Sequence, residues 1–225
     1  MNCLLVACAF GSLGSLEPLL GNFLDKEFGI DPSMTALVFI IPTVAYPLTV
    51  FVSNKFLGHV AYKTKMSSGL FIIGLSLMIV GPAGFTGIPS SLFGTLFGVF
   101  GVGVGMALSM VPALPDMVTS GTEELSHIEA SLISDRVSSL INFSMFVGKG
   151  VFAPFAGFLC DKIKFKSTMA IIGGIILLYL LIFRLATRPK YTIAGLNSST
   201  GKRLLSDNEL KETKKSFYLL EEDEV

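Results

Sequence analysis

One acidic and one basic residue interrupt long apolar segments of this chain, and both are candidates for chemistry. Glu17 is the single charged residue of segment 1–23 and precedes Pro18, while Lys149 lies inside the apolar segment 137–159. An ionisable group in the middle of a membrane span is costly and often marks a substrate or proton pathway. Glu17 therefore indicates proton exchange or cation binding, or else a carboxylate that only holds helices together.

Lys149 belongs to a polar stripe along one face of its segment. At about 100° per residue, the stripe consists of Ser138, Asn142, Met145, Lys149 and Ala153. Lipid does not tolerate such a stripe, so we expect it to face a cavity or another helix. Glu17 is the opposite charge available well inside the membrane, and an ion pair with Lys149 lowers the cost of both charges. The alternative is a Lys149 side chain that extends along its own stem to the membrane surface.

The composition is that of a membrane protein. Hydrophobic residues make up 51% of the chain and charged residues 15%, and the mean hydropathy is +0.69. The formal net charge is zero, and no basic patch with interleaved aromatic residues indicates a nucleic-acid partner. No catalytic constellation, metal motif or cofactor motif indicates an enzyme. Cys3, Cys8 and Cys160 are expected to be small packing residues rather than a disulfide framework.

Six apolar segments are each close to the roughly 20 residues that a membrane helix needs. They cover residues 1–23, 34–52, 66–85, 91–111, 137–159 and 168–185. The sequence therefore predicts an all-α, multi-pass integral membrane protein with six transmembrane helices in the lipid bilayer. We assign residues 1–190 to this six-helix domain. The polar residues 191–225, which end in a cluster of acids, predict a disordered cytosolic tail.

The basic residues of the loops predict the orientation in the membrane. Basic clusters at 55–65 and 184–190 follow the second and sixth segments, whereas the loop after the third contains no Lys or Arg. By the positive-inside rule, these clusters and both termini are cytosolic. The lysines within 162–166 argue against this orientation because they fall on the opposite side. A sugar on Asn197, which opens a glycosylation sequon, would overturn it.

The fourth segment is rich in glycine, and the first combines glycine with proline. Glycines three and four residues apart lie along one helix face and let a neighbouring helix approach closely. The fourth segment contains Gly94, Gly98, Gly101, Gly103 and Gly105, with Pro112 just beyond. Gly14 and Pro18 flank Glu17 in the first. Either static packing or a sliding helix interface accounts for the glycine face, and a proline inside a span favours a bend or a cavity lining.

Three short motifs, taken in order and spacing, resemble one transporter family. They are Leu16-Glu17-Pro18, Pro112-Ala113-Leu114-Pro115-Asp116 and the run from Gly148 to Phe158, which reads GKGVFAPFAGF. Together they resemble the C-terminal half of a major facilitator superfamily transporter, and within that superfamily the vesicular amine and polyamine transporter branch. The resemblance covers residues 11–185.

The resemblance implies proton-coupled transport of a small, cationic organic solute by alternating access. The six segments would be helices seven to twelve of a twelve-helix transporter, arranged as two inverted three-helix repeats. The first and fourth would line the central cavity. The fifth would correspond to the antiporter-motif helix, in which Gly150, Pro154 and Gly157 serve helix packing and gating. The substrate or proton pathway would then include Glu17, Ser138, Asn142 and Lys149.

The sequence departs from the family pattern at several positions. Ala153 and Phe158 stand where the antiporter motif has glycine, and Asn54 stands where the cytosolic loop motif has an acid. Ala107 and Phe143 occupy positions at which the monoamine transporters of the branch have acids. The resemblance therefore implies a polyamine-like or another cationic substrate rather than a monoamine.

A transporter of this family needs two six-helix halves to enclose a substrate path. The resemblance therefore implies that the chain is half of a transporter and works with an N-terminal half, in a vesicle membrane or the plasma membrane. The solute and protons would be its other partners. The alternative is a non-transporting membrane scaffold or binding module, or an inactive fragment.

Overall fold

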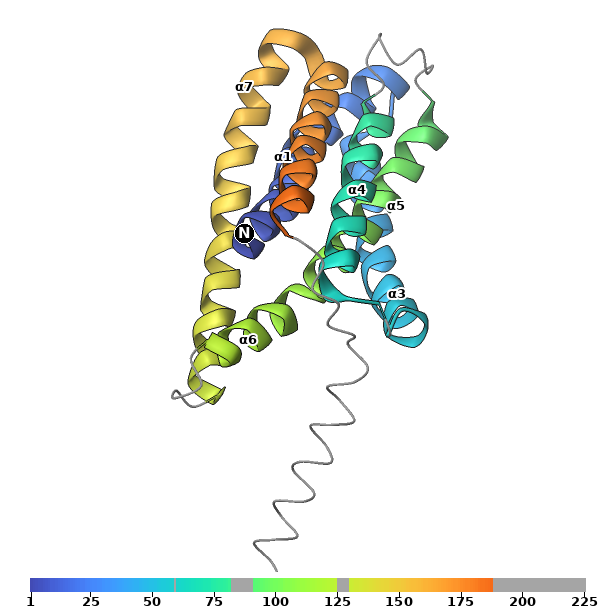
Figure 1. Ribbon diagram of the computed structural model, residues 1–225. Helices are drawn as coiled ribbons and strands as arrows, with labels where there is room; N and C mark the ends of the chain where they lie inside the picture. The colour runs from blue at the N-terminus through green and yellow to red at the C-terminus, as the bar shows by residue number, and fades with distance from the viewer. Residues whose placement is uncertain (59, 82–90, 125–129, 188–225) are drawn as a thin grey trace, which may run out of the picture.

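Every element of the described chain is an α-helix. The computed structural model describes residues 1–58, 60–81, 91–124 and 130–187, and this part contains no strand. The long helices run alongside one another, and α6 lies obliquely at one end (Figure 1). The helices are α1 (Asn2–Phe28), α2 (Pro32–Val38), α3 (Ile40–Phe56), α4 (Tyr62–Val80), α5 (Leu92–Met110), α6 (Ala113–Glu124) and α7 (Ala130–Ala186). The predicted all-α class is confirmed. The predicted tail 191–225, with Asn197, and the end of the third predicted segment at 82–85 lie outside the described residues.

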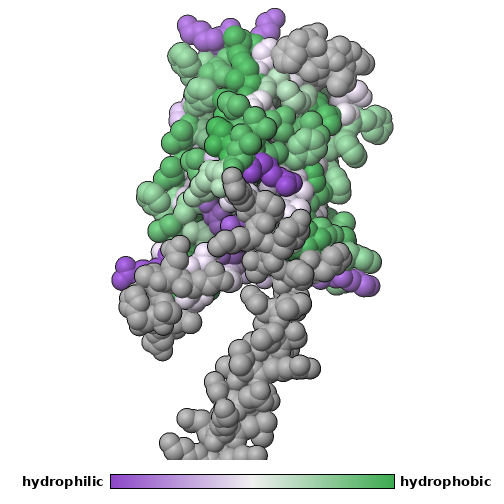
Figure 2. All heavy atoms as spheres, in the orientation of Figure 1, coloured by the Kyte–Doolittle hydropathy of each residue, from purple (hydrophilic) through white to green (hydrophobic). Residues whose placement is uncertain are grey.

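Five stretches of this part of the chain are long and apolar enough to cross a membrane as helices. They are Asn2–Phe28, Ser33–Phe56, Tyr62–Val80, Leu92–Thr122 and Leu132–Ala186. Figure 2 shows that hydrophobic side chains cover most of the visible face between hydrophilic residues at its two ends. An outer surface of this kind is what a helix bundle presents to lipid.

The last helix, α7, holds two of the six predicted segments. A straight helix of its 57 residues would be about 85 Å long, which far exceeds the ~30 Å of the hydrocarbon core. Lys164 leaves the helical conformation, with φ 66° and ψ 161°. The chain turns back there, so that α7 forms two arms (Figure 1). Residues 137–159 lie on the arm before Lys164 and residues 168–185 on the arm after it.

A proline explains why the second predicted segment consists of two helices. Pro42 has no N–H to donate to the carbonyl of Val38, four residues earlier, and α2 ends at Val38. Phe39 joins the two helices with a helical φ of −73° and ψ of −13°. α3 therefore continues from α2 with a local break only, and it accommodates Pro47 in its interior.

The first helix extends to Phe28 rather than to the predicted Phe23. The last turn of this helix contains the charged residues 25–27. Long charged side chains are tolerated there because, at a helix end, they can reach the membrane surface. Gly29 then ends the helix in the left-handed conformation, with φ 65°, and its N–H donates to the carbonyl of Asp25.

Close packing through glycine joins α5 to α4, as the sequence predicts. A Cβ atom on Gly98 or Gly105 would lie 2.6 Å from the side chain of Val80 or Ile73, respectively, so these positions have no room for one. Gly101 lies equally tightly against α4. Association of membrane helices depends on this kind of contact, since lipid offers no hydrophobic driving force between helices.

Three other predicted packing glycines have no such contact. A Cβ atom on Gly94 would meet only Ser91 of its own turn, at 3.9 Å, and Gly150 and Gly157 have nothing within 4 Å in the described part of the chain. Within the described part of this chain these three glycines therefore make no close helix contact, and their role in packing or gating stays a prediction. Pro112 lies between α5 and α6.

The buried core lies between α1, α4 and the second arm of α7. Its fully buried side chains include Leu5, Leu16, Leu20, Leu70, Ile73, Leu77, Met169, Ile172, Ile176 and Phe183. Cys8 belongs to this core and Cys160 packs against it, whereas Cys3 is only half-buried. This core fixes α1 against α7, and those two helices carry the charged residues singled out by the sequence.

Candidate functional site

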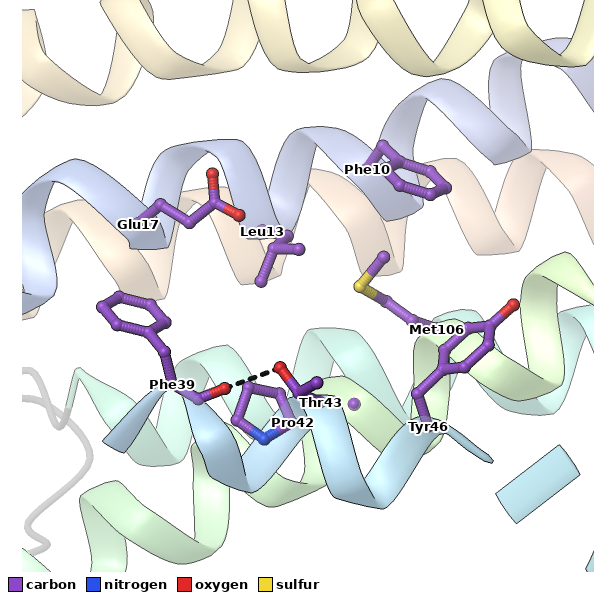
Figure 3. Close-up of a pocket in the computed structure, with 9 residues that line it drawn as sticks. Phe10, Leu13, Glu17, Phe39, Pro42, Thr43, Tyr46 and Met106 are labelled. Atoms are coloured by element: carbon purple, nitrogen blue, oxygen red, sulfur yellow. Dashed lines mark hydrogen bonds between the residues drawn. The ribbon is translucent and has the colours of Figure 1, made fainter. Parts of the chain in front are cut away.

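A cavity of about 500 Å³ opens between α1, α3 and α5 (Figure 3). It is lined by Phe10, Leu13, Glu17, Phe39, Pro42, Thr43, Tyr46, Gly103 and Met106. Among these lining residues Glu17 is the charged one, and most of the others are apolar or aromatic. The volume falls in the range of roughly 300–1,000 Å³ that is usual for small-molecule sites.

Helical spacing brings the lining residues onto common faces. Phe10, Leu13 and Glu17 are separated by three and four residues on α1, and residues 39, 42, 43 and 46 repeat the same spacing around the start of α3. On α5, a Cβ atom on Gly103 would lie 2.7 Å from the carbonyl oxygen of Pro42. Glycine at this position therefore lets α3 pack directly on α5.

The cavity combines one carboxylate with aromatic rings. Phe10, Phe39 and Tyr46 line the cavity together with Glu17 (Figure 3). The Thr43 hydroxyl donates a 2.8 Å hydrogen bond to the carbonyl of Phe39, so its proton is engaged within the helix. A carboxylate beside aromatic faces is a chemistry that recognises organic cations, because the negative faces of the rings attract positive charge.

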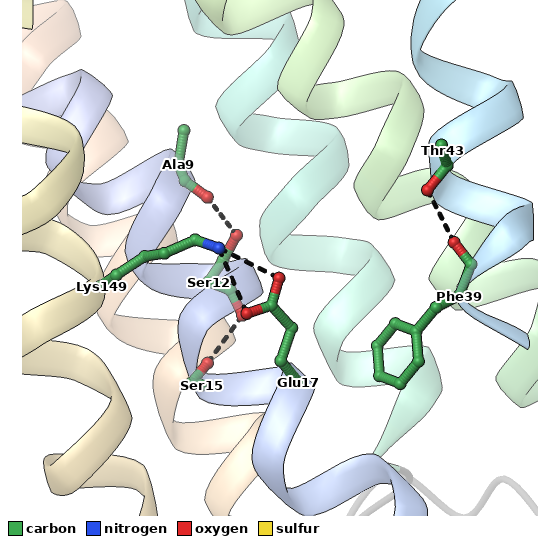
Figure 4. Close-up of polar contacts among 7 residues, drawn as sticks. All are labelled: Ala9, Ser12, Ser15, Glu17, Phe39, Thr43 and Lys149. Carbon is green, nitrogen blue, oxygen red and sulfur yellow. Dashed lines mark hydrogen bonds and ion pairs between the residues drawn. The ribbon is translucent and has the colours of Figure 1, made fainter. Parts of the chain in front are cut away.

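The predicted ion pair between Glu17 and Lys149 is present. Lys149 Nζ lies 3.1 Å from Glu17 Oε1 and 3.2 Å from Oε2, so the ammonium contacts both carboxylate oxygens (Figure 4). The Lys149 side chain therefore does not extend away to the membrane surface. The two side chains remain 39% and 43% exposed in this chain, for Lys149 and Glu17 respectively. Part of the pair therefore lies at the surface of this chain.

Two glycines place Lys149 beside Glu17. A Cβ atom on Gly14 would lie 3.0 Å from Lys149 Cα and 3.1 Å from its Cγ, so the lysine stem lies directly on the α1 backbone. One residue earlier on α7, Gly148 packs against the carbonyl of Ala7 so closely that a Cβ atom would clash. Pro18 has no N–H to donate to the carbonyl of Gly14, so the helix lacks one backbone hydrogen bond at the turn that carries Glu17.

The hydroxyl groups near the pair bond to their own helices. Ser12 and Ser15 are buried and donate to the carbonyls of Ala9 and Ser12 at 2.6 and 2.7 Å (Figure 4). Ser138 donates to the carbonyl of Ser134 at 2.9 Å. These hydroxyls are therefore satisfied without contacting Glu17 or Lys149.

The rest of the predicted polar stripe does not join the site. Asn142 is exposed and does not line the cavity, and Ser138 is only half-buried. The buried side of this arm of α7 runs instead through Ile141, Ser144 and Gly148. The stripe lies beside that packed side, so within this chain Asn142 faces neither the cavity nor another described helix, and its shielding from lipid stays a prediction.

A second polar region lies near the turn of α7, and the sequence analysis missed it. Lys166 forms an ion pair with Glu27 of α1, and the rings of Phe23 and Phe165 stack with centroids 4.2 Å apart. A cavity of about 640 Å³ there is also lined by Asn22, Lys26, Asp161 and Lys164. The opposite charges at 25–27 and 161–166 were the available signal, since both groups follow long apolar segments.

Neither region resembles a metal centre. Among the described residues, no three His, Cys, Asp or Glu side chains come together as a metal site would require.

Comparison with known proteins agrees with the fold. The family model of the Major Facilitator Superfamily matches residues 3–219. The chain is 28% identical over 229 residues to the MFS-type transporter SLC18B1 of Homo sapiens, a match that covers 96% of this chain and 47% of that protein. It is 28% identical over 164 residues to the rat (Rattus norvegicus) protein of the same name, covering 71% of this chain and 35% of the rat protein.

The matches cover less than half the length of these relatives. The family model, by contrast, covers nearly all of this chain, and the described part contains several helices long and apolar enough to span a membrane. The chain therefore belongs to the Major Facilitator Superfamily and is a multi-pass integral membrane protein.

Proposed function

We infer that this chain contributes one half of a proton-coupled carrier for a small organic cation that works by alternating access. The observation that carries this proposal is Glu17, a carboxylate on the wall of an aromatic cavity in a membrane-embedded bundle. The family and the relatives named as transporters support membrane transport in general. The cation, the protons and the second half are parts of the proposal.

Recognition of the solute rests on Glu17 and the rings around it. An ammonium group beside the carboxylate gains a charge-assisted contact, and the faces of Phe39 and Tyr46 add cation–π attraction. Because Glu17 carries the charge among the described lining residues, this half offers a place for one positive group. Further ammonium groups of a polyamine-like solute would need acids from the other half.

The proposed architecture has six spans. Each arm of α7 counts as one span, and the other four stretches complete the set. Six spans arranged as two inverted three-helix repeats match the half-transporter plan of the superfamily. In Figure 1 the end of α7 and the connection from α3 to α4 lie at the same end of the bundle. This placement supports a cytosolic position for both basic clusters.

A second six-helix half would complete the solute path. Val44, Leu48, Phe51 and Phe56 expose large apolar side chains along α3, as do Phe143 and Phe146 on α7. Glu17 and Lys149 are also accessible in this chain. We propose that the other half faces Glu17 and Lys149 across the solute path, so that the charged pair lies in a closed cavity and not against lipid.

Uptake driven by a pH gradient tests the proposal. Membrane vesicles from cells that express the chain contain any partner half, and radiolabelled phenyltrimethylammonium is a suitable permanent cation. We expect uptake with the wild-type chain and none above background with Glu17→Gln, which keeps the shape of the side chain but removes its charge and titration. Glu27→Gln, which alters the other α1 acid paired with a lysine, is the matched control and should transport normally. Equal uptake by wild type and Glu17→Gln would show that Glu17 only packs helices.

A further inference from the structure

We propose that the cavity beside the turn of α7 binds the headgroup of a phospholipid that carries one net negative charge. The cavity has a volume of about 640 Å³ and lies between α1 and α7. It is separate from the cavity that Glu17 lines, because the two have no lining residue in common. The inference therefore goes beyond the proposed transport, and either of the two can fail while the other holds.

The cavity lies at an end of the helix bundle. α1 ends at Phe28, and α7 reverses at Lys164. Figure 1 shows this turn at one end of the bundle, and Figure 2 shows hydrophilic residues at that end beside the hydrophobic face. In a membrane, the hydrocarbon core gives way to lipid headgroups at this level. A phospholipid can therefore reach the cavity with its headgroup and with the first carbon atoms of its acyl chains.

The lining of the cavity changes from apolar to charged along the helix axis. On α1 it follows one face from Leu19 through Phe23 to Lys26, over about 10 Å. Phe23 stacks on Phe165 of α7, with ring centroids 4.2 Å apart, and both side chains are buried. An amphiphile matches this gradient, with its apolar part beside the rings and its phosphate beside the charged end. A free phosphate ion would use the charged end alone.

The charged lining residues have one positive charge in excess. They are three lysines and two acids, namely Lys26, Lys164, Lys166, Glu27 and Asp161. Lys166 Nζ lies 2.5 Å from Glu27 Oε1, so these two charges neutralise each other. Within the described ranges of the chain, neither Lys26 nor Lys164 forms an ion pair. A headgroup with one net negative charge would neutralise the excess, and its phosphate would accept charge-assisted hydrogen bonds from these lysines.

The backbone at Lys164 adds a second argument. Its φ of 66° and ψ of 161° are rare for a residue with a Cβ atom, and strained conformations of this kind cluster at ligand-binding sites. A lysine at this turn supplies a cation to the cavity, which a glycine would not. The predicted orientation puts the lysines within 162–166 on the side of the membrane opposite the basic clusters. An anionic headgroup as their partner gives them a role there.

Photo-crosslinking of the full chain in phosphatidylcholine nanodiscs tests this proposal. The probe is a trace amount of phosphatidylglycerol with a diazirine near the ester end of one acyl chain, and peptide mapping by mass spectrometry locates the crosslinks. We expect them at residues 19–23 of α1 and 160–165 of α7. Unlabelled phosphatidylglycerol in excess should suppress them, whereas the same amount of inorganic phosphate should not.

Two substitutions test the contribution of the unpaired lysines. Lys26→Gln and Lys164→Gln each remove one positive charge from the cavity, and each should lower the crosslinking yield at these residues about fivefold. Lys162→Gln is the matched control, because Lys162 precedes the same turn but does not line the cavity. Its yield should stay within about twofold of the wild type. Labelling of the exposed apolar face of α3 by a phosphatidylcholine probe shows that each variant is folded and inserted.

Three results would overturn the proposal. Equal labelling of the cavity by phosphatidylcholine with the same diazirine would show that the net charge of the headgroup plays no part. Suppression by inorganic phosphate would assign the cavity to a soluble anion. Equal losses in Lys162→Gln and Lys26→Gln would show a diffuse attraction of lipid to this end of the bundle. None of these results would change the uptake expected from the Glu17 cavity.

Discussion

The two ion pairs between α1 and α7 differ in their surroundings, although both consist of a glutamate and a lysine. Glu17 and Lys149 lie in otherwise uncharged stretches, and Glu17 lines the aromatic cavity. Glu27 and Lys166 lie beside the turn of α7, in a cavity also lined by Lys26, Asp161 and Lys164. If a solute cation displaced Lys149 from Glu17, the Lys149 ammonium would have no other acid nearby among the lining residues. Lys166, by contrast, lies in a cavity that Asp161 also lines. The first pair therefore suits exchange and the second suits fixing the ends of two helices.

Loss of the cavity carboxylate should have the largest effect of any change to either pair. Glu17→Gln is expected to weaken binding of phenyltrimethylammonium by about 30-fold or more, because losing one partner of a close charge pair costs about 2–5 kcal/mol. Glu27→Gln should leave binding within about twofold of wild type, since Glu27 does not line the aromatic cavity. Equilibrium dialysis of both variants measures the difference, and similar losses in both would erase the distinction drawn between the two pairs.

Adding one methyl group at the contact of α1 with α7 should have the next largest effect. Gly148→Ala places a Cβ atom against the carbonyl of Ala7 and should lower the free energy of unfolding by about 1–3 kcal/mol. Gly150→Ala is the matched control, because nothing lies within 4 Å of that position in the described chain. Thermal unfolding in detergent compares them. Equal melting temperatures would show that this contact does not fix the position of Lys149.

Replacing an aromatic wall of the cavity should have a moderate effect on binding alone. Tyr46→Leu is expected to weaken phenyltrimethylammonium binding roughly 2- to 30-fold, since a cation–π contact contributes about 0.5–2 kcal/mol. Phe51→Leu changes an aromatic residue of the same helix that is 68% exposed and does not line the cavity. It should bind as the wild type does. Isothermal titration would contradict the aromatic site if the two variants weakened binding equally.

The smallest expected effect concerns the turn of α7 beside the second pair. Lys164 has a φ of 66°. This backbone conformation is strained for a residue with a Cβ atom, whereas glycine adopts it without strain. Lys164→Gly should therefore raise the free energy of unfolding by about 1 kcal/mol. Lys162→Gly, two residues earlier in helical backbone, should lower it by about the same amount. Urea or thermal unfolding measures both changes. If both substitutions changed the free energy of unfolding in the same direction, strain at Lys164 would be contradicted.

The sequence predicted those features that depend on strong local signals. The apolar length of the segments indicated membrane helices. The opposite charges of Glu17 and Lys149 within such segments indicated that the two residues form a pair. Glu17 and Lys149 could be paired because the apolar interior leaves so few ways to neutralise a charge. The close contact of Gly98, Gly101 and Gly105 followed from their spacing.

The cavity itself could not be predicted in the same way. Phe39, Pro42, Thr43 and Tyr46 follow helical spacing, but the residues around them are also apolar, so no contrast marked that face. The polar stripe that includes Asn142 does not reveal whether it faces this chain or another, so its partner could not be predicted. The reversal at Lys164 depends on a backbone conformation that lysine rarely adopts, and residue type gave no indication of it.

The position of a bound cation tests the central claim most directly. Crystals of the chain soaked in 4-iodophenyltrimethylammonium locate the iodine by its anomalous scattering, and the map then shows the cation around it. The account predicts the cation in the cavity between Glu17 and Tyr46, with Lys149 no longer in contact with both carboxylate oxygens, and no such peak in Glu17→Gln. A cation bound beside Glu27 and Lys166 instead, or an unchanged peak in Glu17→Gln, would contradict it.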